Sequence, residues 1–161
     1  MKRTLGLTLL LFATLFSCMR QEKPLPAELS RAESVMWEHP DSALSILRSM
    51  PQSSLSIGKN YATWALLLAQ ARDKVYGKRL PDSLNIPSSD KLVQDAMDYF
   101  EKEGDLKRMA QTYYYKGQLL KDQKKITEAM PFFLKSKEMM TKLDEPLFTY
   151  LICQSLGNMY R

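Results

Sequence analysis

The sequence contains few of the residues that build metal centres and disulfide scaffolds. Among 161 residues there are two cysteines and one histidine. Cys18 and Cys153 lie far apart, and neither has a metal-ligating neighbour at short spacing. The sequence therefore predicts no metal site and no cofactor. It also predicts that Cys153, inside a helical pattern, is a small buried apolar residue.

Motifs that support catalysis are also missing. The chain has no glycine-rich phosphate loop, no nucleophile elbow and no paired histidines or cysteines. His39 stands at a helix end beside Pro40 with no evident carboxylate partner. Acids such as Glu101 and Glu103 suit a solvated helix face. We therefore expect no catalytic residue and no enzymatic activity.

Charge of one sign is not clustered. The formal net charge is +5, to which Lys2 and Arg3 of the N-terminal segment contribute. Elsewhere the lysines alternate with acids. Such a pattern is typical of a solvated basic surface rather than a nucleic-acid groove, so we expect no nucleic-acid partner.

Strand-type alternation of apolar and polar residues is absent, and only six glycines and eight prolines interrupt the chain. These features predict an all-α fold. Helices are expected at 27–38, 42–50, 57–75 and 90–102, in a hairpin over 109–143, and at 147–161. The expected caps are Asp41 or Ser42 for the second helix, the pair Gly104–Asp105 before the hairpin, and Asp144 before Pro146 for the last helix.

Gly117 lies in the middle of a helical pattern within the hairpin. Glycine at such a position costs roughly 1 kcal/mol relative to alanine. Its presence indicates a second helix crossing too closely for a side chain. Ala129 is the small residue expected to meet it.

The only long hydrophobic run lies at the N-terminus. Two basic residues precede about twelve apolar residues, from Leu5 to Phe16, and Ser17–Cys18 follow. This pattern is typical of a secretory signal and is too short for a spanning helix, which needs about 20 residues. The sequence from Leu15 to Cys18 resembles a bacterial lipobox, which implies cleavage before a lipid-modified Cys18. A plain signal peptide with an incidental cysteine is the alternative.

Three segments follow from this interpretation. Residues 1–17 form a lipoprotein signal peptide, residues 18–26 a flexible tether with two prolines, and residues 27–161 a helical repeat domain. An ordered lead-in to the first helix is the alternative for 18–26.

A spacing pattern recurs along the helical domain. First helices carry bulky, bulky, small and bulky residues at Tyr61–Trp64–Ala65–Leu68, and comparable residues at Tyr113–Lys116–Gly117–Leu120 and Cys153–Leu156–Gly157–Tyr160. Second helices carry a small residue and a bulky one four later: Ala43 and Leu47, Ala96 and Phe100, Ala129 and Phe133. This resembles the tetratricopeptide repeat, whose period is near 34 residues. Lys116 in place of leucine and a forty-residue step from Gly117 to Gly157 depart from it.

The resemblance implies an α-solenoid of antiparallel helix hairpins, with about three and a half repeats and the last incomplete. An unrelated helical bundle is the alternative. Together with the lipobox, the PDSAL segment and the long second loop, the chain resembles tetratricopeptide lipoproteins of the Bacteroidetes type. That resemblance implies a membrane-anchored scaffold in the cell envelope, facing the periplasm, which binds a protein or peptide partner.

In this family the first helix of each pair lines a concave surface. By resemblance, the partner-binding residues are Lys59, Gln111, Tyr114, Gln118, Lys121, Gln154 and Asn158, with Ala62, Leu66 and Ala69 at the remaining inward positions. An ordinary solvated surface is the alternative for each of them.

Two further functions are compatible with the sequence. The strongly apolar last helix suggests the N-terminal sensory fragment of a longer signalling or transcriptional regulator, truncated at its C-terminus. Otherwise its apolar face is a dimer contact. A structural role in an envelope lipoprotein assembly is the third possibility.

Overall fold

The computed structural model describes residues 24–51, 55, 58–76 and 88–159, which form seven α-helices and no β-strand. In chain order the helices are α2 (Ala27–Val35), α3 (Pro40–Ser49), α4 (Lys59–Tyr76), α5 (Ser89–Glu103), α6 (Leu106–Asp122), α7 (Ile126–Lys142) and α8 (Pro146–Met159). The predicted all-α class is confirmed. The predicted signal segment and Cys18 lie outside the described residues.

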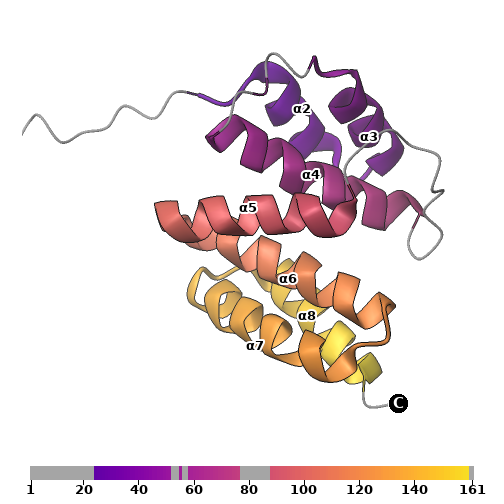
Figure 1. The fold of residues 1–161 in the computed structure, drawn as a ribbon, viewed down its shortest axis with the longest axis vertical. Coiled ribbons are helices and arrows are strands. Elements are labelled where there is room, and N and C mark those ends of the chain that lie inside the picture. The colour runs from indigo at the N-terminus through magenta and orange to yellow at the C-terminus, as the bar shows by residue number, and fades with distance from the viewer. Residues whose placement is uncertain (1–23, 52–54, 56–57, 77–87, 160–161) are drawn as a thin grey trace, which may run out of the picture.

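The helices follow one another through the molecule in chain order (Figure 1). Each helix packs against the next, and α2, α4, α6 and α8 also contact one another in series. Within the described ranges, α3, α5 and α7 make no such contacts with each other. We call α2, α4, α6 and α8 the inner helices and α3, α5 and α7 the outer helices.

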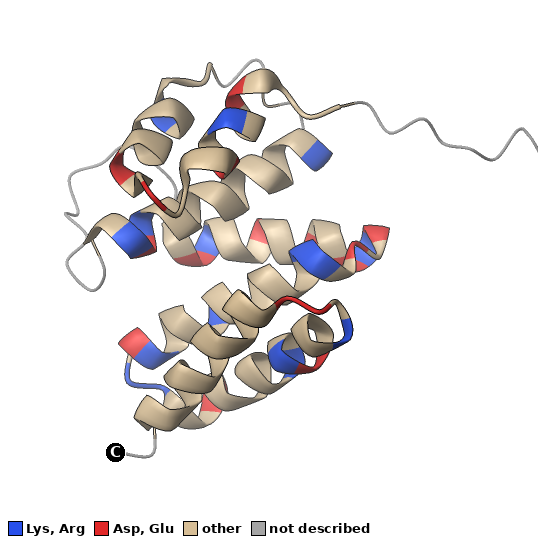
Figure 2. Ribbon diagram, turned by 180° about the vertical axis from the view of Figure 1, so that it is seen from behind, with Lys and Arg blue, Asp and Glu red and all other residues tan. Residues whose placement is uncertain are grey.

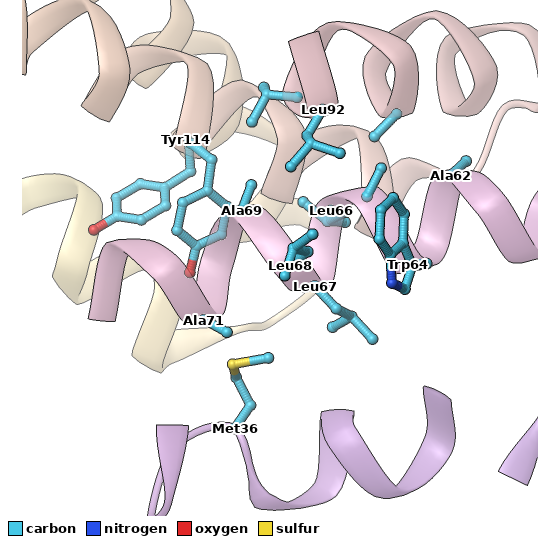
Figure 3. Packing of buried hydrophobic residues seen from close by; sticks show 14 of the residues in the cluster. Met36, Ala62, Trp64, Leu66, Leu67, Leu68, Ala69, Ala71, Leu92 and Tyr114 are labelled. Carbon is cyan, nitrogen blue, oxygen red and sulfur yellow. The ribbon is translucent and has the colours of Figure 1, made fainter. Parts of the chain in front are cut away.

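Helix α4 lies at the centre of the hydrophobic core. Every residue from Ala62 to Arg72 is buried, and α4 contacts α2, α3, α5 and α6. Side chains such as Leu66, Leu67 and Leu68 project from it in different directions (Figure 3). The indole nitrogen of Trp64 donates a hydrogen bond of 2.9 Å to the carbonyl of Leu47 on α3. Helix α4 therefore packs on more than one face.

The turn between α5 and α6 uses the predicted residues. Gly104 ends α5 with a left-handed φ of 74°, where glycine carries no Cβ penalty. Asp105 then caps α6, because its carboxylate accepts a hydrogen bond of 3.0 Å from the Arg108 backbone N–H.

Two other predicted caps are wrong. Helix α3 already begins at Pro40, and neither Asp41 nor Ser42 is its N-cap residue, because the fixed φ of proline suits the first helical position. Asp144 has a φ of 54° and donates its backbone N–H to Thr141, while Glu145 donates to Met140. This pattern closes α7, so Asp144 ends one helix instead of starting the next.

The close crossing predicted at Gly117 is present, with a different partner. A Cβ atom at Gly117 would lie 2.9 Å from Cε1 of Phe133 on α7. The ring of Phe133, rather than the methyl group of Ala129, therefore fills the space that glycine leaves. A hydrogen bond of 2.6 Å from the Ser136 hydroxyl to the Ala110 carbonyl joins the same two helices.

Cys153 is exposed, so the expectation that it is buried is wrong. It lies on the exposed side of α8, at the edge of a groove that Met140 and Thr141 of α7 also line, whereas Phe148, Ile152 and Ser155 form the buried side. Helical periodicity identified the segment as a helix but did not show which side had a neighbour.

Two glycine-to-alanine substitutions test the crossing. Gly117→Ala should lower the free energy of unfolding by about 1–2 kcal/mol, because overpacking against Phe133 outweighs the gain in helix propensity. The matched control is Gly157→Ala, measured at a protein concentration low enough to keep the chain monomeric, since no described atom of the same chain lies within 4 Å of its added Cβ. It should raise stability by about 0.5–1 kcal/mol. Urea unfolding measures both, and equal stabilisation by the two changes would contradict the close crossing.

Candidate partner-binding site on the inner helices

The structure brings four of the seven predicted partner-binding residues together on α6. Gln111, Tyr114, Gln118 and Lys121 recur at intervals of three and four residues, which places them on one side of a helix. We call these four residues the α6 polar row. Tyr114 contacts α8 through its ring, so the row faces the neighbouring inner helices.

Tyr114 is the buried centre of this row, with 5% of its surface exposed. Its ring centroid lies 5.0 Å from that of Tyr115, and 5.9 Å from those of Phe133 and Phe148. Trp37, just beyond α2, meets Phe148 edge-on with ring centroids 5.5 Å apart. The Tyr114 ring therefore belongs to an aromatic cluster that joins α2, α6, α7 and α8.

The polar end of Tyr114 is held by hydrogen bonds. The Gln118 amide donates to the phenol oxygen at 2.6 Å, and the Lys121 ammonium donates to the Gln118 carbonyl oxygen. Burial raises the pKa of Tyr114, and hydrogen bonds from Ser155 and Gln118 act in the opposite direction. The phenol is therefore neutral near pH 7 and serves as a fixed polar group.

Charged residues from α4 adjoin the Lys121 end of the row. Burial raises the pKa of the Asp73 carboxyl; Asp122 acts in the same direction, while Lys121 and Lys74 oppose it. The Lys74 ammonium lies 3.4 Å from the centroid of the Trp37 ring, a cation–π geometry. Burial lowers the pKa of Lys74, and Asp73 partly offsets that change. Acids and bases alternate among these partly buried residues.

The other end of the row is closed by an ion pair between α2 and α6. The Arg108 guanidinium lies 2.7 Å from the Glu33 carboxylate and donates to the Gln111 side-chain oxygen at 3.3 Å. Gln111 is only 5% exposed. The accessible part of the row is therefore its Gln118–Lys121 end, where both residues are half-buried.

The other predicted site residues lie elsewhere. Lys59, the first residue of α4, lines a separate depression of about 210 Å³ beside the turn between α5 and α6. Gln154 and Asn158 lie on the exposed side of α8, opposite the side formed by Phe148 and Ser155. The predicted inward positions Ala62, Leu66 and Ala69 are buried in the core. The seven predicted partner-binding residues are thus divided among α6, the start of α4 and the exposed side of α8.

Sequence reasoning missed Trp37, Asp73 and Lys74, which complete the surroundings of the α6 polar row. Each lies at or near the C-terminal end of a helix, where no local pattern distinguishes it from an ordinary solvated residue. Trp37 could have been found only from its contact with Phe148, which joins the segment after the first described helix to the last helix. Lys74 then follows from its position over the Trp37 ring.

The fold defines a class: an all-α protein of sequentially packed helices, in which the α6 polar row is partly buried. No protein-family model, curated protein or solved structure matches the chain. In the described part of the chain, no helix combines the length and hydropathy needed to cross a bilayer. The same part contains no cluster of three or more His, Cys, Asp or Glu side chains that could hold a metal ion.

The raised pKa of Asp73 predicts a pH dependence of stability. A carboxyl whose pKa is raised by folding binds its proton more tightly in the native state, so its destabilising effect is present above that raised pKa. Asp73→Asn should therefore stabilise the protein at pH 7. Its advantage should shrink as the pH falls toward the ordinary aspartate value near 3.8. Urea unfolding across this range measures the difference.

Asp98→Asn, an exposed change on α5, is the control and should leave the Asp73-dependent slope intact. An Asp73→Asn variant that is less stable than the parent at pH 7 would contradict the role assigned to burial.

Proposed function

We propose that this chain is a non-enzymatic, tetratricopeptide-type repeat module that binds a protein or peptide on its inner helices. The supporting observation is that the inner helices contact one another in series while carrying the α6 polar row. Neighbouring hairpins in a helical repeat bury the apolar face that one hairpin cannot cover alone, and the stack curves into a concave surface. In this proposal, α2, α4, α6 and α8 line that surface.

The hairpin of α6 and α7 supports the repeat interpretation. The recurring small residue of the first helix, Gly117, meets the recurring bulky residue of the second, Phe133. Ala129 and Phe133 are both fully buried, as the second-helix pattern requires. The same small-to-bulky pattern recurs at Ala96 and Phe100 on α5, which are also buried.

The accessible groups indicate the chemistry of the partner. Gln118 offers an amide and Lys121 an ammonium, both half-buried. Trp37 is 39% exposed and carries the Lys74 ammonium over its ring. Charged residues of both signs are distributed over the ribbon (Figure 2). An extended peptide with backbone carbonyls and an acidic side chain would satisfy these donors.

Photo-crosslinking tests the binding surface. A photo-reactive side chain at position 118 should yield a discrete adduct in the envelope of the producing cell. Lys121→Glu should lower its yield about tenfold, because it reverses the charge at the edge of the contact. Lys137→Glu, an exposed change on α7, is the matched control and should leave the yield unchanged. An adduct that forms equally well in the Lys121→Glu variant would contradict the proposal.

The proposed location is the cell envelope, with the domain facing the periplasm and a lipid on Cys18 anchoring it to a bacterial membrane. The lipobox-like residues Leu15–Cys18 support this location, and a single lipid chain gives only marginal binding, so a diacylglycerol is suited to stable anchoring.

Cys18→Ser should abolish incorporation of a labelled fatty acid and release the chain from the membrane fraction. Cys153→Ser removes the other cysteine and should preserve both properties. Retained labelling in Cys18→Ser would exclude this anchor.

A further inference from the structure

The exposed side of α8 is an uncharged stripe. No residue from Pro146 to Met159 carries a charge, and α8, which leads to the end marked C, is tan along its length (Figure 2). The exposed members are Pro146, Leu147, Tyr150, Cys153, Gln154, Gly157 and Asn158. We call them the α8 stripe. Tyr150 is 63% exposed and Leu147 is 49% exposed, and large apolar side chains exposed side by side are typical of an interaction surface.

The same positions are covered in α6. Helices α6 and α8 begin forty residues apart, at Leu106 and Pro146, so Gly157 corresponds to Gly117 and Tyr150 to Ala110. In α6, Gly117 receives the Phe133 ring, and the Ala110 carbonyl receives the Ser136 hydroxyl. In α8, no described atom lies within 4 Å of a Cβ placed at Gly157. The α8 stripe is therefore open where the corresponding side of α6 is covered by α7.

The α8 stripe itself carries an aromatic ring, that of Tyr150. Tyr150 and Gly157 are seven residues, or two helical turns, apart and so share one side of the helix. Its large apolar residues, Leu147 and Tyr150, lie in the N-terminal half, and the C-terminal half carries Cys153, Gly157 and two uncharged amides. In an antiparallel pair whose two-fold axis passes between Cys153 and Gln154, each Tyr150 lies over the Gly157 of the other copy.

We propose that the α8 stripe binds the α8 stripe of a second copy of this chain, forming a two-fold symmetric dimer. The occupant is inferred from complementarity of shape and charge. Tyr150 reproduces toward Gly157 the contact that Phe133 makes with Gly117, and an uncharged helix meets its own copy without bringing like charges together. Of the two residues beside the axis, Cys153 is small and Gln154 is uncharged.

The test uses the full chain with Cys18→Ser in mild detergent, so that Cys153 is the only thiol. Sedimentation should give twice the mass of one chain, and mild oxidation should produce a dimer linked through Cys153, because the two thiols lie next to the two-fold axis. Tyr150→Lys and Gly157→Leu should each return the mass to that of one chain and remove the crosslink. The helical circular dichroism should stay unchanged, since neither side chain is covered in the single chain.

Leu134→Lys is the matched control, because Leu134 is a 52%-exposed leucine on α7 outside the stripe and its replacement should leave the dimer intact. A chain that sediments as a monomer, a dimer that survives both stripe substitutions, or a Cys153 crosslink formed only with a different protein would each overturn the proposal.

Discussion

The structure depends on the burial of α4 on all sides. Residues 62–72 are buried without interruption, and no single neighbouring helix can cover a full cylinder, so α2, α3, α5 and α6 must all be in place. Burial of a leucine side chain contributes about 1.5–3 kcal/mol, and Leu66, Leu67 and Leu68 obtain it from different neighbours. The first three inner helices are therefore mutually dependent, and the inner surface near α4 is more rigid than an isolated hairpin would be.

Some features fixed within a few residues could be predicted from the sequence, although the caps expected at Asp41 or Ser42 and at Asp144 were wrong. Gly104 and Asp105 form the expected stop and cap because their roles depend on local backbone geometry. The crossing at Gly117 was predictable because a mid-helix glycine is unfavourable without a close neighbour. Its partner was not, since a Phe133 ring reaches a helix axis that the Ala129 methyl group cannot. Cys153 was misplaced for a related reason: periodicity gives the apolar side of a helix but not the helix that covers it.

The candidate site shows the same limit more strongly. The resemblance to the tetratricopeptide repeat grouped Gln111, Tyr114, Gln118 and Lys121 on one side of the helix, and the structure keeps them together on α6. Their exposure was set by residues far away in sequence: Phe148 packs on Tyr114, and Glu33 engages Arg108 beside Gln111. The resemblance implied an accessible row, but Gln111 and Tyr114 are buried and only Gln118 and Lys121 are partly exposed. Lys59, Gln154 and Asn158 separated from it because repeats of unequal length do not preserve one register along the chain.

The closure of this row connects it to the last helix. Only Phe148, Ile152 and Ser155 are buried in α8, so few side chains hold that helix, and Phe148 and Ser155 both bear on Tyr114. Any partner that binds the α8 stripe only when α8 is packed in its native position stabilises that position by its binding free energy. That energy also favours the Phe148–Tyr114 contact and the hydrogen bonds at the phenol. Helix α8 thus carries the α8 stripe on its exposed side and contacts the α6 polar row with its buried side. A contact that holds α8 in place also holds the Tyr114 side chain in place.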